Sequence, residues 1–380
     1  MELTFRREDI LTQMKMVNMA VGNSPIPILS NLLISTTYDP LAGLLGSDAD
    51  GKIYLAGTDL EIGIRVSVDS QVTDGGSITI PAKKFAAMIK EMPDSEIHLV
   101  TTPDDKVSIS CGSAKFKIAG LPADEFPPLI EDRDVHKKRY FVSMDAKVLS
   151  TMIQQTSYAA SREEIRHFLN GVHISLRDNT VKMAATDGKR LAVATGITND
   201  TIEKERQGII PIRALERLKD MLMYTVDVRI CLDDNRIIFD MGDVTLVSRL
   251  IEGEFPDYEK VIPVENGIRL TMGTDSLFSI VKRISTMANP KTPGVTIETT
   301  GEILKVKAST PEYGEGYEET QIKKEGEDIS IGLNANFLMD ILKATDKDEV
   351  IFSMSDPLKP ILVKPVDNDG YTCVIMPMRL

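Results

Sequence analysis

One apolar strand ending in Thr-Asp occurs twice in the chain. It reads IYLAGTDL at residues 53–60 and VKMAATDG at residues 181–188. Thr58 and Thr186 occupy the same place in the two copies, at an offset of 128. Because internal repeats define whole architectures, this pair of strands is the first guide to the fold.

Two further landmarks follow the strand in both copies. A proline that opens an amphipathic helix lies at Pro81 and again at Pro211, at an offset of 130. Phe-Pro closes each copy, at residues 126–127 and 255–256, at an offset of 129. Three landmarks in one order at nearly one spacing indicate a true repeat rather than a chance similarity.

A third, more diverged copy occupies the last third of the chain. LKVKAS at residues 304–309 takes the place of the Thr-Asp strand, and IGLNANF at residues 331–337 takes the place of the proline helix. Three units of nearly equal length use up the 380 residues. We therefore predict three domains, at residues 1–135, 136–264 and 265–380.

Each unit is predicted to contain short half-buried strands and two helices. The alternating or β-branched stretches that indicate strands include residues 77–81, 106–111, 226–232 and 350–354. The i, i+3, i+4, i+7 apolar spacing indicates helices at residues 81–92, 211–223 and 334–345, each preceded in its unit by a first helix at Glu8–Ala20, Asp145–Tyr158 and Thr274–Met287. Runs of strands with few helices place the chain in the α+β class.

The bulk composition is that of a globular protein. Charged residues make up 27% and hydrophobic residues 42% of the chain. No apolar run reaches the roughly 18 residues of a membrane span, and the N-terminal MELTFRREDI has charges where a signal peptide is apolar. We therefore expect a cytoplasmic protein with no membrane association. Its three separated cysteines, Cys111, Cys231 and Cys373, are expected to be reduced and buried.

The basic residues are concentrated on the predicted helices. The formal net charge of −13 opposes nucleic-acid binding on average. Counted over residues 6–20, 81–92, 144–158, 211–223, 274–287 and 334–345, the six helices nevertheless carry thirteen basic and eight acidic residues, so that the rest of the chain has a charge of −18. A solvated face explains any one such helix, whereas the bias across all six favours a shared anionic partner. The predicted DNA-facing residues are Lys15, Lys83, Lys84, Lys90, Lys147, Arg166, Arg213, Arg217, Lys282, Arg283 and Lys343.

No catalytic, metal or cofactor motif is found. Residues 46–52, GSDADGK, have the spacing of a P-loop but are followed by Ile53 and a strand instead of Ser or Thr and a helix. The four histidines lack metal-ligand spacing, and no G-x-S-x-G elbow occurs. Asp59 and Asp187 could suggest a carboxylate pair, but equivalent residues of separate domains lie far apart. We expect these two residues to have a structural role at the strand end.

Four segments together resemble the bacterial DNA polymerase III β sliding clamps. They are PIPILSNLL at residues 25–33, ATDGKRLA at 185–192, EFPDY at 254–258 and VIMPMRL at 374–380. The match runs the full length of the chain in order, and the C-terminal MPMRL is its most specific element.

The resemblance implies an architecture and a role. Three repeated clamp domains, each with two helices inside and antiparallel sheets outside, would form a six-domain ring as a head-to-tail homodimer. Such a ring holds double-stranded DNA topologically, without sequence preference, and is an accessory subunit of a DNA-directed DNA polymerase rather than an enzyme. The implied partners are the replicative polymerase α subunit, the clamp loader, and other polymerases and repair proteins; no cofactor is implied.

The resemblance also implies a groove between the second and third domains that accepts short apolar peptides from these partners. Aliphatic walls would supply burial, and a few polar groups would fix the orientation of the peptide. For Val374 and Leu191 a plain core role is an equal alternative. The groove residues carried over are Leu169, Thr186, Gly188, Lys189, Arg190, Leu191, Pro256, Val261, Asn334, Phe337, Leu358, Pro360, Val374, Ile375, Met376, Pro377, Met378, Arg379 and Leu380.

Two other functions compete with the clamp. A repeat scaffold could bind proteins through the same groove without encircling DNA, but it would not need basic helix faces. A metal-dependent phosphatase or nuclease would need acidic motifs clustered at one site, and the sequence has none. A second, divergent clamp of its organism is also compatible with the pattern.

Overall fold

The computed structural model describes residues 1–22, 24–36, 51–129, 140–163, 165–264 and 267–379. These residues form two compact units, Met1–Lys147 with Arg213–Leu250, and Val148–Ile212 with Ile251–Leu380. Most of the stretch Tyr38–Lys52 lies outside the described residues. No helix among the described residues has the length and apolar character to span a membrane.

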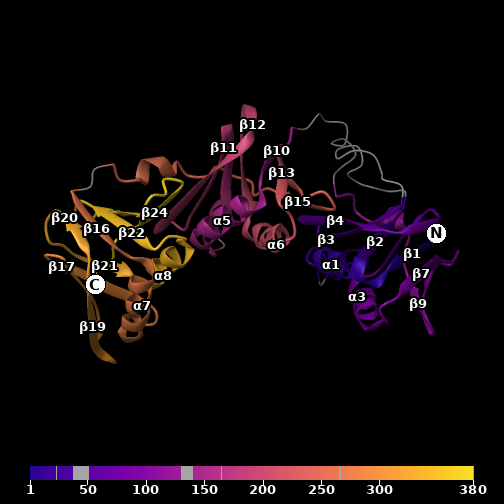
Figure 1. The fold of residues 1–380 in the computed structure, drawn as a ribbon, viewed down its shortest axis with the longest axis horizontal. Coiled ribbons are helices and arrows are strands. Elements are labelled where there is room, and N and C mark those ends of the chain that lie inside the picture. Colours follow the sequence, from indigo (N-terminus) through magenta and orange to yellow (C-terminus); the bar gives the residue numbers. More distant parts are fainter. Residues whose placement is uncertain (23, 37–50, 130–139, 164, 265–266, 380) are drawn as a thin grey trace. The chain divides into compact units, whose positions relative to one another are not determined.

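Two antiparallel sheets build the first unit (Figure 1). The five-stranded sheet has the order β5 (Gln71–Asp74), β1 (Glu2–Arg6), β7 (Glu96–Thr101), β8 (Lys106–Cys111) and β9 (Ala114–Ala119). The eight-stranded sheet has the order β10 (Val142–Asp145), β13 (Asp227–Leu232), β14 (Arg236–Asp240), β15 (Val244–Arg249), β4 (Ile62–Asp69), β3 (Lys52–Thr58), β2 (Asn31–Ser35) and β6 (Ser77–Pro81). The unit's helices are α1 (Arg7–Asn18), α3 (Ala82–Glu91) and nearly all of α6 (Ile212–Leu222), with 3₁₀ turns at Pro27–Ser30 and Ala123–Glu125.

The second unit also has two antiparallel sheets. The seven-stranded sheet has the order β11 (Gly171–Thr186), β12 (Arg190–Pro211), β24 (Tyr371–Ile375), β23 (Ile361–Pro365), β22 (Glu349–Met354), β16 (Ile268–Gly273) and β20 (Lys323–Glu325). The four-stranded sheet has the order β19 (Gly314–Gln321), β18 (Ile303–Thr310), β17 (Gly294–Thr300) and β21 (Ser330–Asn334). Its helices are most of α5 (Ala146–Thr156), α7 (Thr274–Ile284) and α8 (Ala335–Ala344), with 3₁₀ turns at Ser157–Ala159, His167–Leu169, Tyr258–Val261 and Ser285–Met287.

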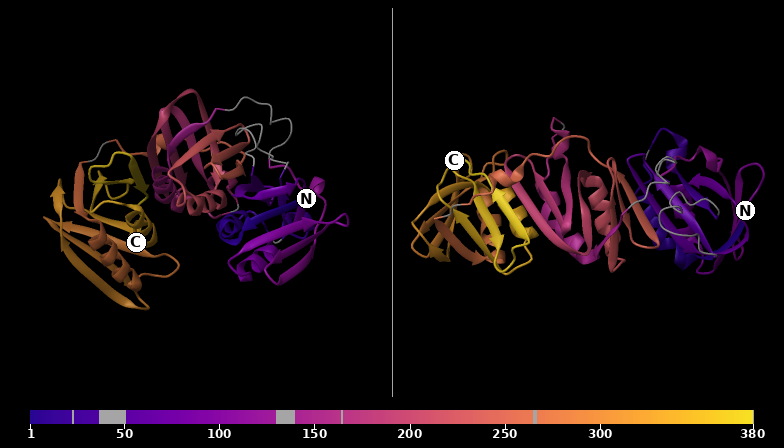
Figure 2. Two further views of the ribbon diagram at one scale, coloured as in Figure 1. Left: turned by 45° about the vertical axis from the view of Figure 1, so that its right-hand side comes forward. Right: turned by 90° about the horizontal axis from the view of Figure 1, so that it is seen from above.

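The predicted helices are confirmed among the described residues, and their apolar stripes face the core. Leu215 and Leu218 of α6 and Leu338 and Ile341 of α8 are all buried. Figure 2 shows the pair α7 and α8 (orange to yellow) lying along one face of the neighbouring strands. Burial of one helix stripe against a sheet is what the α+β assignment required.

The first helices of the second and third repeats end earlier than predicted. α5 stops at Thr156, where the Thr156 and Ser157 hydroxyls donate hydrogen bonds to the carbonyl oxygens four residues before them. α7 stops at Ile284, and the Thr286 hydroxyl donates to the Arg283 carbonyl. After each of these two helices the backbone continues as a 3₁₀ turn, because hydroxyls that bond the backbone compete with the regular hydrogen bonds of the α-helix.

Successive repeats share a continuous sheet. In the first unit β4 pairs with β15, where Ile62 faces Ser248. In the second unit β12 pairs with β24, where Arg190 faces Ile375. The two registers are equivalent, since Ile62 and Arg190 are separated by an offset of 128, and Ser248 and Ile375 by an offset of 127. We call β4–β15 the first junction and β12–β24 the second junction.

The Thr-Asp motif forms the same turn in both repeats. The Thr58 hydroxyl donates to the Ile62 carbonyl, and Asp59 Oδ1 accepts from the Ile62 amide at 2.7 Å. The Thr186 hydroxyl likewise donates to the Arg190 carbonyl, and Asp187 Oδ1 accepts from the Arg190 amide at 3.1 Å. The expected structural role of the two aspartates is thereby confirmed.

The third residue of this turn has a positive φ in both repeats. Gly188 has φ 85°, a conformation that glycine adopts without steric cost. Leu60, which takes the same place in the first repeat, has φ 75°. The hydrogen bonds of the turn therefore hold a leucine in a region that β-carbon-bearing residues rarely occupy.

Candidate functional site

A mainly apolar cavity of about 340 Å³ lies at the second junction. Ten of the predicted groove residues line it: Leu169, Thr186, Gly188, Lys189, Arg190, Leu191, Pro256, Val261, Val374 and Met376. Three lining residues were missed, namely Phe168, Asp257 and Tyr258. Asp257 and Tyr258 belong to the EFPDY segment, and Phe168 precedes Leu169. Their closeness in sequence to predicted groove residues could have indicated all three. Arg166, which we predicted to face DNA, lies here as well.

The floor of the cavity comes from the two strands of the second junction. Leu191 on β12 faces Val374 on β24, and both side chains are buried in a cluster with Ala184 and Val193. The rim is more open, because the Val261 and Met376 side chains are largely exposed. An apolar floor beside an exposed apolar rim can bury the side chain of a ligand.

Arg190 forms the ridge at one end of the cavity. Its guanidinium donates to Asp187 Oδ2 at 3.1 Å, to Asp340 Oδ2 on α8 at 2.6 Å and to the Tyr158 carbonyl at 2.7 Å. Its Cζ also lies 4.3 Å from the centroid of the Phe337 ring. With these contacts the arginine is rigidly held, and it ties the strand of one repeat to the helix of the next.

Beyond this ridge lies a second, more polar cavity of about 580 Å³. Phe337 lines this cavity and not the apolar one, together with Tyr158, Ser161 and Asp340. Lys189 and Arg190 line both cavities. The predicted groove thus consists of two neighbouring spaces that share one basic ridge.

An aromatic group supports the wall of the apolar cavity. The ring of His173 stacks on Phe255 with centroids 5.1 Å apart, and the ring of Tyr258 meets Phe255 edge-on at 6.1 Å. Burial lowers the pKa of His173 and, with nearby carboxylates, raises the pKa of Tyr258 to about 12. Both side chains are therefore neutral near pH 7, as an apolar wall requires.

The remaining predicted groove residues lie outside the apolar cavity. The Asn334 side chain caps α8 by accepting from the amides of Asn336 and Phe337. Ile375 is fully buried, because its side chain points to the opposite face from Val374. Leu358 and Pro360 belong to the loop between β22 and β23, while Pro377, Met378 and Arg379 follow β24; Leu380 lies outside the described residues.

The short tail after β24 is held by the backbone. The Met376 amide donates to the Lys189 carbonyl at 2.9 Å, and the Met378 amide donates to the Gly332 carbonyl at 2.8 Å. These two bonds fix the tail against the Thr-Asp turn on one side and against β21 on the other.

The predicted DNA-facing residues are exposed with one exception. Arg217 on α6 is mostly buried and pairs with Asp59 of the Thr-Asp turn at 3.4 Å. Arg213 also pairs with Asp59, and Arg283 pairs with Glu318, although both arginines remain largely exposed. The others, all exposed, are Lys15, Lys83, Lys84, Lys90, Lys147, Arg166, Lys282 and Lys343.

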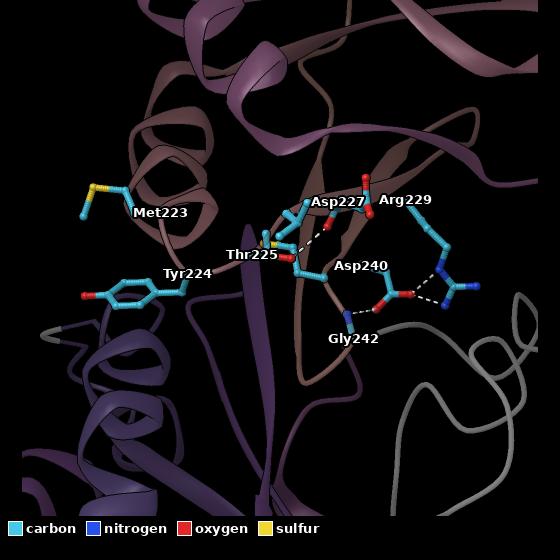
Figure 3. Close-up of a pocket in the computed structure, with 9 residues that line it drawn as sticks. Met223, Tyr224, Thr225, Asp227, Arg229, Asp240 and Gly242 are labelled. Atoms are coloured by element: carbon cyan, nitrogen blue, oxygen red, sulfur yellow. Dashed lines mark hydrogen bonds and ion pairs between the residues drawn. The ribbon is translucent and has the colours of Figure 1, made fainter.

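A third cavity, of about 690 Å³, lies in the first unit beside the loop after α6 (Figure 3). Met223, Tyr224 and Val226 on this loop are largely exposed. Among the described residues that line this cavity, Arg229 is the one cation, and it is paired with Asp240. None of the predicted groove or DNA-facing residues lines this cavity.

The described residues contain no cluster of three or more histidine, cysteine or acidic side chains placed to hold a metal. The three cysteines are free and buried, as predicted. Burial raises the pKa of Cys373 to about 11, although the hydroxyls of Tyr158 and Tyr371 lie close by. This thiol is therefore inert near neutral pH.

Comparison with known proteins covers almost the whole chain. Residues 1–130, 143–257 and 259–379 match the N-terminal, central and C-terminal domains of the DNA polymerase III beta subunit. The chain is 31% identical to the beta sliding clamp of Chlamydia muridarum over 96% of its length and 95% of the relative. It is 30% identical to that of Pseudomonas aeruginosa over the full length of both.

Solved structures give the same result. The crystal structure of the DNA polymerase III subunit beta from Pseudomonas aeruginosa matches all of both chains with a TM-score of 0.91 at 29% identity. That from Thermotoga maritima has a TM-score of 0.86 at 27% identity, covering 100% of this chain and 99% of the other.

The chain therefore belongs to a class of proteins that consist of three repeated clamp domains, built from antiparallel sheets and few helices. The chain belongs to the DNA polymerase III beta subunit family, the beta sliding clamps. As a beta subunit it is an accessory subunit of the polymerase and not a catalytic one.

Proposed function

We propose that two copies of this chain close head to tail into a ring around duplex DNA, and that the groove at the second junction tethers the replicative polymerase, the clamp loader and other replication and repair proteins. The observation that carries the proposal is the equivalent strand pairing at the two junctions. A repeat that joins its neighbour twice in one way can join a second copy in the same way.

Among the described residues, two junction-type strand edges remain unpaired, one equivalent to β15 and β24 and one equivalent to β4 and the start of β12. β9 ends the first sheet of its repeat, as β15 and β24 end theirs, but it has no partner beyond β8 among the described residues. β19 corresponds to β4 and to the start of β12, and it likewise ends its described sheet. Antiparallel pairing of β19 with β9 of a second copy would repeat the junctions within the chain, and two such contacts would close a ring.

The two free edges are complementary. β9 carries Lys115 and Lys117 beside an exposed Phe116, whereas β19 carries three glutamates beside an exposed Tyr317. Opposite charges and an apolar pair across neighbouring strands stabilise antiparallel contacts. They also oppose pairing of two β9 edges or of two β19 edges, because like charges would face each other.

The DNA role is supported by the exposed basic residues of the helices. The chain as a whole has a formal net charge of −13, so these basic residues are concentrated on the helices and are not typical of the whole chain. Lysines that meet phosphates bind without regard to sequence, and a ring needs no tight contact to stay on the duplex.

Retention on DNA tests the ring directly. Chains loaded on a closed circular plasmid are expected to stay bound through gel filtration and to dissociate when the plasmid is cut once. The uncut circle serves as the control, and equal retention on both forms would contradict encirclement.

The groove role is supported by the apolar cavity and its rim. Leu191 and Val374 provide a floor that can bury an aliphatic side chain, and exposed Met376 can adapt to varied ligands. Exposed Lys189 at the ridge suits an acidic group in the same peptide. A Met376→Lys variant, which places a charge on the exposed rim, is expected to lose binding of a polymerase peptide, with unchanged thermal unfolding as its control; retained binding would contradict the assignment.

A further inference from the structure

A smaller cavity at the first junction repeats the groove cavity. Its volume is about 180 Å³, against about 340 Å³ at the second junction. Its lining residues hold the same places in the repeat as groove residues: Thr58 corresponds to Thr186, Gly63 to Leu191, Pro127 to Pro256 and Val247 to Val374. The repeat has therefore produced two sites of one design, of unequal size.

Leu129 accounts for the difference in size. This residue is buried in a cluster with Leu33, Ala56 and Phe126. A Cβ atom built on Gly63 would lie only 2.6 Å from Leu129 Cδ2. The Leu129 side chain thus occupies the space directly over β4 that the missing side chain at position 63 leaves free.

The second junction has the opposite arrangement. Leu191 supplies a side chain on the strand, and Tyr258, which takes the place of Leu129, is held in the wall by Phe255 and His173. The space over the strand stays open there. The rims differ as well, since exposed Arg249 takes the place of Met376.

We infer that Leu129 is an internal plug that closes the first-junction counterpart of the groove, so that partner peptides bind one junction and not both. The inference rests on the proposed function of the groove. Leu129 is in this sense a specificity-determining residue, because it sets the number of peptide sites per chain.

Counting bound peptides tests the plug. The probe is a fluorescein-labelled pentapeptide that contains leucine and phenylalanine, titrated into the full-length chain. Wild type is expected to bind one equivalent, Leu129→Ala two and Leu191→Lys none. The double variant Leu129→Ala/Leu191→Lys is expected to bind one equivalent, more weakly than wild type because Arg249 replaces the methionine of the rim. Leu99→Ala, which empties a core position of the five-stranded sheet, controls for general loosening and should bind one.

The outcomes separate the two proposals. One equivalent on Leu129→Ala together with none on the double variant would overturn the plug while leaving the groove intact. No binding to wild type would overturn the groove, and the plug with it.

A stability cycle tests the packing independently of any peptide. Gly63→Leu alone is expected to lower the melting temperature, because its side chain meets Leu129. Adding Leu129→Ala should make the Gly63→Leu substitution less harmful than it is in wild type, as contacting residues couple. Additive effects of the two substitutions would show that Leu129 does not fill this space.

Discussion

At the scale of single residues, ion pairs link the Thr-Asp turn to a helix at both junctions. The residue on the helix is basic at the first junction and acidic at the second. Arg217 and Asp340 are each the sixth residue of their helix, α6 and α8. Asp59 meets Arg217 directly, whereas Asp187 reaches Asp340 only through Arg190, which lies between the two carboxylates. The bridging arginine therefore belongs to the second junction alone, where it also forms the ridge of the groove.

Loss of one carboxylate at this bridge should weaken the second unit. Asp340→Asn leaves the mostly buried Arg190 with Asp187 as its remaining anionic partner. The free energy of unfolding is expected to fall by about 1–2 kcal/mol, the order expected when a charged hydrogen-bond partner is removed. Urea denaturation measures this change. Asp346→Asn, on the exposed loop after α8, is the control, and equal stability of the two variants would contradict the bridging role.

The half-buried His173 should make stability depend on pH. Because burial lowers its pKa in the folded chain, the unfolded chain binds the proton more readily between that lowered pKa and the ordinary value near 6.5. The stability of the folded chain is thus complete above pH 6.5 and falls on acidification through this window. His173→Phe keeps the stacking on Phe255 and should show a smaller loss of melting temperature between pH 7 and pH 5. An identical pH profile would contradict this assignment.

At the scale of helices and strands, periodicity predicted what lies within one repeat. The stripes around Phe85, Leu215 and Ile341 indicated α3, α6 and α8, because a helix that buries one face must repeat its apolar residues every three or four positions. The stretches 77–81 and 106–111 match β6 and β8 at both ends. Burial leaves a periodic signal in the sequence, and such elements can therefore be predicted.

Contacts between repeats leave no such signal. Nothing in the spacing of β4 or β12 indicates that each pairs with a strand of the next repeat, since any half-buried strand has the same alternation. Phe337 and Ile375 were assigned to the groove by the resemblance and not by their own spacing; Phe337 lines the polar space beyond the Arg190 ridge, whereas the Ile375 side chain enters the core. The plug could not be predicted because it depends on an absent side chain at Gly63.

The tail after β24 should matter for binding and little for assembly. Deletion of residues 376–380 removes Met376 from the rim of the groove and cuts the two backbone bonds that fix the tail. Binding of the polymerase is expected to be abolished in a pull-down assay, while dimerisation stays largely intact because β9 and β19 are untouched. Unchanged polymerase binding would refute the groove assignment.

At the scale of the whole molecule, the proposed pairing of β9 with β19 of a second copy predicts a dimer. Light scattering should give twice the 42.0 kDa of the single chain. The double variant Lys115→Glu/Lys117→Glu places acidic residues opposite the glutamates of β19 and should shift the mass toward that of the single chain. Lys106→Glu, on the neighbouring β8, is the control. A double variant that keeps the full mass would exclude β9 as the dimer edge.

The proposed ring is closed by two copies of the same contact, and each chain contributes a different edge to each of them. A chain altered only on β9 and a chain altered only on β19 would therefore still share one sound contact when mixed. The product would be an open two-chain assembly, joined at one β9–β19 contact and permanently unpaired at the other. Such an assembly would thread onto a circular plasmid without a loader and slip off again, which would separate the act of opening the ring from every other task of its partners.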